Sequence, residues 1–263
     1  MAKGSAGYDQ IIEKIFFDHY SKNCLDFVFV RKEIVAAKDL LAPQLDLNPG
    51  DVPYAYRYRR ELPTAILATQ PVGKVWIIEG AGRSKYRFRL VPATRIAPNP
   101  TLIEIKIPDA TPEIIRAYAM DDEQALLAIL RYNRLVDTFL GLTTYSLQNH
   151  LRTFVSGVGQ IEIDELYIGL DTVGAHYIIP VQAKGGKDQI GVVQTTQDIK
   201  FAETKFPGMR CKAVSAQFMH NGAVALFHLT IQNDEVKIVD ERHYRLVPAA
   251  ELTDHDVRNY RPN

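Results

Sequence analysis

The sequence predicts a two-domain protein of the α/β class, with a helix-rich N-terminal domain and a mixed-sheet C-terminal domain. Residues 8–22 and 30–42 carry apolar side chains at the spacing of a buried helix face. Five prolines fall between residues 91 and 112 and mark a boundary. Helical segments and then strands with one further helix among them follow. We therefore place the domains at residues 1–108 and 109–263.

The composition excludes several classes of protein and of partner. Lys+Arg and Asp+Glu both number 31, so net charge does not indicate a partner. The two cysteines, Cys24 and Cys211, lack metal-site spacing, which favours a reducing cytoplasm. No apolar stretch reaches the roughly 20 residues needed to span a membrane, and no secretory signal begins the chain. We therefore expect no membrane partner. No phosphate-binding P-loop occurs, so we also expect no nucleotide cofactor.

The N-terminal domain has the element order of a DNA-binding module. A third helix is expected after the turn at residues 48–50, and residues 74–80 and 85–91 alternate like two strands of a hairpin. Three helices followed by a two-stranded wing are the order of a winged helix, a helix-turn-helix variant. The sequence thus predicts a winged-helix-like α+β domain that binds double-stranded DNA.

Basic and aromatic side chains cluster on the expected third helix and on the wing. Arginine contacts guanine or phosphate, and tyrosine contacts phosphate or sugar. The alternative is a solvated basic surface paired with nearby acids. The candidate DNA-binding residues are Tyr54, Tyr56, Arg57, Arg59 and Arg60 on the helix, and Arg83, Lys85 and Arg87 on the wing.

For the C-terminal domain, the sequence predicts helices followed by strands, with one helix inserted among the strands. Apolar periodicity and alternation distinguish the two kinds of element. We expect an edge strand at 101–107, helices at 121–141, 145–154 and 189–206, and strands at 161–171, 176–184, 211–220, 223–231 and 235–247.

One strand ends in an unusual way. Alternate residues of "HYIIPVQAK" from Tyr177 to Ala183 give a wholly apolar face, whereas Gln182 and Lys184 share the other face. A lysine at the end of a buried strand is costly unless it is paired or lies in a cleft. The glycines that follow let a ligand or a backbone approach closely.

The preceding strand brings carboxylates to the same end. If Asp171 pairs with Ala175, Asp164 lies across from Gln182 and Glu162 across from Lys184. A loop one residue shorter would place Glu165 across from Gln182 instead, because a register slip exchanges the faces. We prefer the first register.

Carboxylates beside a lysine suit a divalent cation. Mg²⁺ binds through one or two carboxylates with phosphate and water. The alternative is a surface ion pair on a sheet edge. The glutamines that follow either reach DNA phosphates or form a solvated helix face; they are Gln189, Gln194 and Gln197.

The paired segment "IEIDELYIGLD…HYIIPVQAKGG" resembles the core of the PD-(D/E)xK nuclease superfamily, over roughly residues 142–237. Asp164, Gln182 and Lys184 match its three motif positions. Two departures are Ile163 in place of the proline and Gln182 in place of the second acid. The Mrr-type branch is similar in carrying Gln-x-Lys. The resemblance implies a restriction-endonuclease-like mixed sheet with flanking helices.

The resemblance also implies residue roles. Asp164, Gln182, Lys184 and Glu165 would be catalytic, and Asp164 with Glu165 or Glu162 would hold Mg²⁺, or Mn²⁺ as a substitute, with Asp171 behind them. Lys184 would orient or deprotonate the attacking water, or stabilise the phosphorane, and Gln182 would position the metal or the water. In some relatives the helix before the strands also contributes a glutamate to the site. Residues 146–154, the helix expected here, contain no acidic residue.

The expected function is therefore a Mg²⁺-dependent endonuclease of duplex DNA, most simply a type II restriction enzyme. Cutting both strands with one site per chain favours a homodimer. Two alternatives stay open: a DNA-binding regulator with a degenerate nuclease fold, and a repair or junction nuclease.

Overall fold

The computed structural model describes residues 3–58, 60–93, 96–118, 123–156, 158–185 and 190–259. Its contacts divide the chain into two compact units. One comprises Met1–Thr94 with Thr153–Ile161, and the other comprises Arg95–Arg152 with Glu162–Asn263. Each unit is described by itself.

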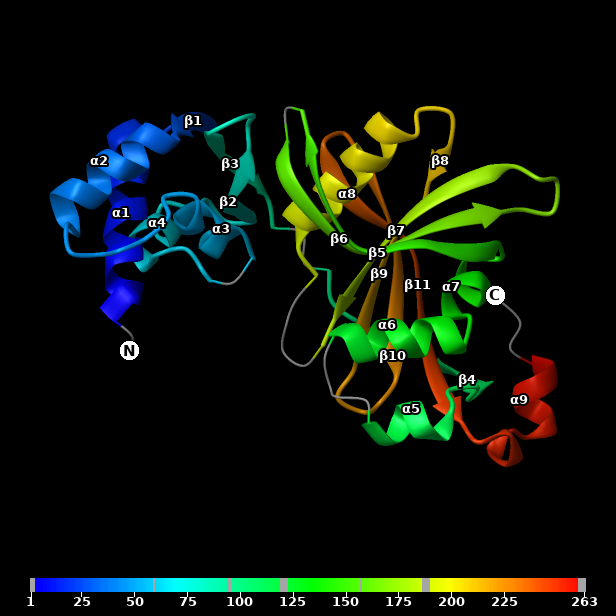
Figure 1. Ribbon diagram of the computed structural model, residues 1–263. Helices are drawn as coiled ribbons and strands as arrows, with labels where there is room; N and C mark the ends of the chain where they lie inside the picture. Colours follow the sequence, from blue (N-terminus) through cyan, green and yellow to red (C-terminus); the bar gives the residue numbers. More distant parts are fainter. Residues whose placement is uncertain are drawn as a thin grey trace. The chain divides into compact units, whose positions relative to one another are not determined.

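The first unit is a helical layer on a small sheet (Figure 1). The strands are ordered β1-β3-β2, and both pairs are antiparallel. The expected helices and hairpin are confirmed, and β1 and α4 are additions to them. The elements are α1 (Lys3–His19), β1 (Asp26–Val30), α2 (Arg31–Leu41), α3 (Asp51–Tyr58), α4 (Thr64–Leu67), β2 (Lys74–Gly80) and β3 (Lys85–Pro92).

An aromatic cluster fills the core of this unit. Phe16 is fully buried, and its ring centroid lies 5.0–5.5 Å from those of Tyr20, Phe27, Trp76 and Phe88. Edge-to-face and stacked ring pairs of this kind stabilise a core beyond the area that they bury. One helix residue thereby joins α1 to all three strands.

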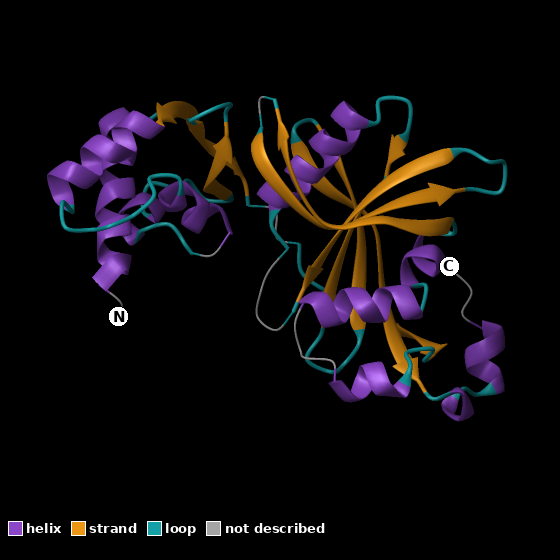
Figure 2. Ribbon diagram, viewed as in Figure 1, coloured by secondary structure: helices purple, strands orange, loops and turns teal. Residues whose placement is uncertain are grey.

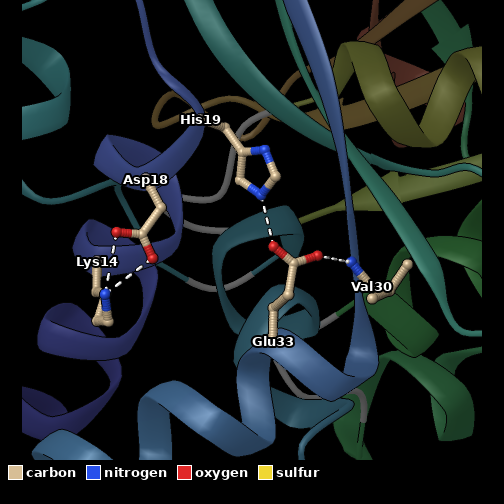
Figure 3. A network of polar contacts seen from close by, with 5 residues as sticks. All are labelled: Lys14, Asp18, His19, Val30 and Glu33. Atoms are coloured by element: carbon tan, nitrogen blue, oxygen red, sulfur yellow. Dashed lines mark hydrogen bonds and ion pairs between the residues drawn. The ribbon is translucent and has the colours of Figure 1, made fainter.

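A carboxylate joins the end of α1 to the start of α2 (Figure 3). Glu33 Oε2 lies 2.5 Å from His19 Nε2, and Glu33 Oε1 accepts the Val30 N–H at 2.7 Å. The second contact satisfies a backbone donor before the first turn of α2, as in a capping box. An i,i+4 ion pair between Lys14 and Asp18 adds to α1 nearby.

The second unit is a mixed eight-stranded sheet flanked by helices, as the predicted α/β class requires (Figure 2). The order is β4-β11-β10-β9-β7-β6-β5, with β8 beside β7. β4 runs parallel to β11, and β7 runs parallel to both β8 and β9. The strands are β4 (Glu104–Pro108), β5 (Thr143–Val155), β6 (Gly159–Leu170), β7 (His176–Lys184), β8 (Arg210–Cys211), β9 (Ala213–Phe218), β10 (Val224–Gln232) and β11 (Glu235–Val247). The last residues of β5 and the first of β6 fall in the segment Thr153–Ile161, which belongs to the first unit.

Helices cover both faces of this sheet, with α6 and α8 on opposite sides (Figure 1). The alternate apolar residues of β7 pack against α6 and α7, as predicted from their spacing. Ile199 of α8 packs with Phe227 of β10 on the other face. The helices are α5 (Glu113–Tyr118), α6 (Glu123–Tyr132), α7 (Leu135–Leu140), α8 (Val192–Lys205), η1 (Ala249–Glu251) and α9 (Asp254–Asn259).

The predicted helix at residues 145–154 is wrong, because this segment lies in strand β5. Leu147, Leu151 and Phe154 have helical spacing in the sequence. Pairing beside β6 overrides that local signal, since tertiary context outweighs propensity.

The predicted helix at residues 121–141 is divided in two. Arg134 takes a left-handed φ of 48° between α6 and α7. Asn133 accepts the Ala110 N–H at 2.7 Å and donates to Thr111 Oγ1 at 2.7 Å. These contacts hold the break, and α7 ends before Gly141, the residue predicted to terminate the helix.

No helix in the described parts of the chain combines the length and the apolar character needed to cross a membrane.

Replacing Ile179 with alanine tests the contribution of β7 to the core. Ile179 is fully buried between the sheet and α6, so we expect Ile179→Ala to lower the free energy of unfolding by about 2–5 kcal/mol. Urea denaturation measures the change. Val173→Ala in the adjacent turn, where the side chain is exposed, is the control and should change the stability by less than about 0.5 kcal/mol. Equal effects would contradict the packing described.

Candidate functional site

The β6–β7 hairpin sets the register of the candidate site. Glu165 pairs with Val181 and Leu170 with His176, and the Asp171 N–H donates to the Ala175 carbonyl at 3.2 Å. The preferred register of the sequence analysis is therefore confirmed. Continued by one residue, the same offset places Asp164 opposite Gln182.

Asp164 lies where the β6–β7 pairing ends. Its Oδ2 accepts the Ala183 N–H at 2.9 Å, and the residue is 8% exposed. Neighbouring side chains of a strand point to opposite faces, so the Asp164 side chain lies on the other face of the sheet from those of Glu165 and Val181. This is the face of Gln182, which is covered by α8.

Gln182 is held by an acid that the sequence analysis did not identify. Its Nε2 donates to Asp198 Oδ2 of α8, and both residues are almost completely buried. The sequence showed α8 only as a glutamine-rich helix. An acid next to Gln197, between apolar residues of the same helix such as Val193, Ile199 and Phe201, was the signal available there.

Strand β9 extends this polar face across the sheet. Ser215 pairs with Gln182 and Gln217 pairs with Lys184 in the parallel β7–β9 ladder. Ser215 is 2% exposed, so its hydroxyl adds to the polar groups buried beneath α8. Polar side chains at one sheet end thus come from three adjacent strands.

Lys184 is paired with the first residue of α6. Its Nζ lies 2.6 Å from Glu123 Oε1, and its side chain is 15% exposed. Residues 146–154 form a strand rather than the expected helix and contain no acid; a helix acid comes instead from Glu123, the first residue of α6. The run of acids at residues 121–123 was the available signal.

Burial raises the pKa values of the two acids on this face. The pKa of Asp198 is held well above its usual range by burial and by the Asp164 charge, against the opposing effects of Gln182 and Lys184. Burial also raises the pKa of Asp164, and Glu123 and Glu162 add to it, while the Ala183 N–H and Lys184 lower it. Acids whose pKa values are raised by burial and by a neighbouring charge are a common feature of functional sites.

The donor set is compatible with a hard cation. No three of the described His, Cys, Asp and Glu side chains are arranged to hold a metal ion, but Mg²⁺ needs only one or two carboxylates besides phosphate and water. Gln182 Oε1 and Asp198 Oδ1 are buried and accept no hydrogen bond from the described residues. Burying acceptor oxygens without a partner costs free energy, and a cation bound between these two oxygens would offset that cost.

The structure does not bring Glu165 to this face. Glu165 is fully buried on the side of α6, where it accepts from Ser146 Oγ at 2.6 Å and lies 3.5 Å from Arg131 Nε. Burial raises its pKa. Its neighbours are therefore different from those of Asp164 and Lys184.

The other two acids considered have separate partners. Glu162 lies 3.1 Å from His150 and 3.2 Å from Arg152, although its charge acts on Asp164. Asp171 accepts the Val173 and Ala175 N–H groups and closes the hairpin turn.

Among the glutamines of α8, Gln197 is 3% exposed and therefore is not on a solvated face, whereas Gln194 is half-buried. Gln189 lies outside the described residues.

The basic and aromatic residues of the third helix, α3, and of the segment after it make contacts within their own unit. Tyr56 is buried, and its hydroxyl donates to Asp9 Oδ1 at 2.6 Å, while Arg60 pairs with the same carboxylate at 3.0 Å. Burial and this hydrogen bond raise the pKa of Tyr56. Tyr54 is 38% exposed and Arg57 is half-buried. Arg59 lies outside the described residues.

The wing differs from the helix in its exposed charge. Arg87 lies 3.8 Å from both Asp26 and Glu79. Arg83 and Lys85 are exposed, and neither forms an ion pair within the described chain. The basic surface that is open to a ligand therefore lies at the tip of the β2–β3 hairpin.

Comparisons with protein-family models, curated proteins and solved structures found no match to this chain.

Replacing Asp198 with asparagine tests the buried acid. Because the folded-state pKa of Asp198 lies above the unfolded value, the folded state binds more protons, and its stability falls as pH rises above about 4. The asparagine amide of the variant does not titrate. We expect the stability of Asp198→Asn relative to the native chain to rise with pH, measured by urea denaturation in EDTA. A pH-independent difference would contradict the burial of this charge.

Proposed function

We propose that this protein is a Mg²⁺-dependent endonuclease that hydrolyses phosphodiester bonds of duplex DNA, most simply as a type II restriction enzyme. The observation that carries the proposal is the buried contact between Gln182 and Asp198. It supplies an acid beside the motif position where this chain has an amide. Asp164 and Lys184 lie on the same face.

The finer fold assignments belong to this proposal. A β1-β3-β2 sheet preceded and interrupted by helices supports a winged-helix-like first unit. In the second unit, the order α6, α7, β5, β6, β7, α8, β8, β9 and the parallel β7–β9 pair support a restriction-endonuclease-like core. Fold analogy alone does not establish an activity, so the proposed function rests on the site residues.

The metal would be held by Asp164 and Asp198, with Gln182 Oε1 as a neutral oxygen donor. When bound, Mg²⁺ supplies positive charge that activates water and stabilises the charge developing on the phosphate. Gln182 fixes one oxygen of Asp198 through its amide, which leaves Asp198 Oδ1 available. The Ala183 N–H similarly orients the carboxylate of Asp164.

Lys184 would act on the scissile phosphate or on the attacking water. Its Nζ either donates to a phosphate oxygen or, once neutral, accepts the proton of the water. Glu123, 2.6 Å away, holds the amine at the end of β7 before DNA arrives. Glu123 is therefore a positioning residue in this proposal.

Recognition of duplex DNA would use the wing and the exposed side of α3. Arg83 and Lys85 offer charge for phosphate contact, and Tyr54 is a partly exposed tyrosine on α3. Arg57 retains its proposed role on α3. A cytoplasmic location and a homodimer that cuts both strands complete the proposal, which needs no nucleotide cofactor.

Replacing Lys184 with alanine tests the catalytic assignment. We expect Lys184→Ala to reduce the Mg²⁺-dependent cleavage rate by at least about 100-fold, because the site loses its acid–base or charge-stabilising group. Binding to duplex DNA in Ca²⁺, measured by fluorescence anisotropy, should change little. Cleavage is followed on plasmid DNA.

Lys200→Ala is the matched control, because Lys200 is an exposed lysine of α8. It should cut at the native rate. Native cleavage by Lys184→Ala would remove the catalytic assignment, and absence of cleavage by the native chain with Mg²⁺ or Mn²⁺ would favour a DNA-binding regulator.

A double replacement, Arg83→Ala with Lys85→Ala, tests the wing. Loss of two phosphate contacts should weaken DNA binding and reduce the slope of log K against log salt by up to about 2. Anisotropy titrations at several salt concentrations measure both quantities. Lys14→Ala, which removes a lysine paired with Asp18 on α1, should leave them unchanged. An unaltered slope in the double variant would move the DNA contact elsewhere.

A further inference from the structure

We propose that residues Thr143–Asn149 of β5 pair antiparallel with the same segment of a second copy of this chain. β5 lies at one end of the strand order, with β6 as its neighbour among the described strands. An edge strand presents a row of backbone N–H and C=O groups that can pair with another strand. This surface is independent of the proposed nuclease site.

The sequence of this edge lacks the usual features that prevent strand pairing. "TTYSLQN" contains no charged residue, proline or glycine. Natural proteins usually protect exposed edges with charges, prolines, bulges or short strands. Seven consecutive residues of β5 carry none of these in their sequence.

The opposite edge of the same sheet has these features. β4 is five residues long and ends at Pro108. Glu104 forms an ion pair with Arg245, and Lys106 lies 3.2 Å from Asp256 of α9. The contrast within one sheet indicates that β5 is the edge open to a partner strand, apart from the Thr144 N–H, which already donates to Asp137 Oδ1 at 3.0 Å.

The exposed side chains of β5 fit against the same side chains of a second copy. Tyr145 is 58% exposed and Leu147 is 53% exposed, whereas Ser146 between them is tied to the buried Glu165. Antiparallel pairing centred on Ser146 places Tyr145 opposite Leu147 of the partner subunit. The two-fold symmetry of the pair repeats this contact between Leu147 and Tyr145 of the partner subunit. Aromatic–aliphatic pairs across strands are stabilising, and no like charges meet.

The pairing has a natural end at His150. This residue takes a left-handed φ of 51°, which interrupts the extended backbone of β5. Beyond it Arg152 introduces charge. The paired segment is therefore short, and it buries less than the roughly 1,200 Å² of a standard stable interface. We expect a concentration-dependent dimer.

Replacing Leu147 with lysine tests this surface, because it places a charge in each of the two symmetric contacts. Sedimentation equilibrium of the full chain, without DNA or metal, should show a reversible dimer whose dissociation constant rises about tenfold or more in Leu147→Lys. Ile114→Lys is the control, since Ile114 is 70% exposed on α5, and it should dimerise like the native chain. Circular dichroism and thermal melting check that both variants fold.

Two results would overturn the proposal: a native chain that is monomeric at every concentration reached, or folded Leu147→Lys that dimerises as tightly as the native chain. Because this measurement involves no cleavage, its failure leaves the proposed nuclease site residues unaffected, although a chain that stays monomeric would also remove the homodimer from the proposed function. Loss of cleavage activity would likewise leave this interface unaffected.

Discussion

The turn that joins β6 to β7 is the constraint on which the candidate site depends. The carboxylate of Asp171 accepts the N–H groups of Val173 and Ala175, and this closes a hairpin in one register. A slip of one residue would exchange the faces of every side chain on β7. The closed turn therefore keeps the apolar residues of β7 against α6 and directs Gln182 toward α8.

A second constraint is the amount of negative charge that this face can bury. Burial raises the pKa values of both Asp164 and Asp198, and the Asp164 charge raises that of Asp198 further. A glutamate at position 182 would add a third carboxylate and lose the amide that donates to Asp198. Gln182 is thus physically consistent with an acid on α8, and in the proposed nuclease Asp198 would supply the charge that position 182 lacks.

Local pattern was sufficient to predict β7, its apolar face and the register of its hairpin, because these depend on residues close in sequence. It failed for β5, where Leu147, Leu151 and Phe154 mimic a helix and pairing with β6 decides the structure. Asp198 and Glu123 could not be assigned to the site, because their contacts span 16 and 61 residues of sequence. On the wing, alternation predicted the basic face, but not that Arg87 would pair with Asp26 and Glu79.

Metal-dependent cleavage of DNA is the most direct test of the proposed activity. Methylated and unmethylated genomic DNA would be incubated with the native chain and Mg²⁺, and the fragment ends would be sequenced. The proposed site predicts discrete ends that form only with Mg²⁺ or Mn²⁺ and disappear with EDTA. Intact DNA of both kinds under these conditions, with DNA binding retained, would contradict the assignment of this face as a nuclease site.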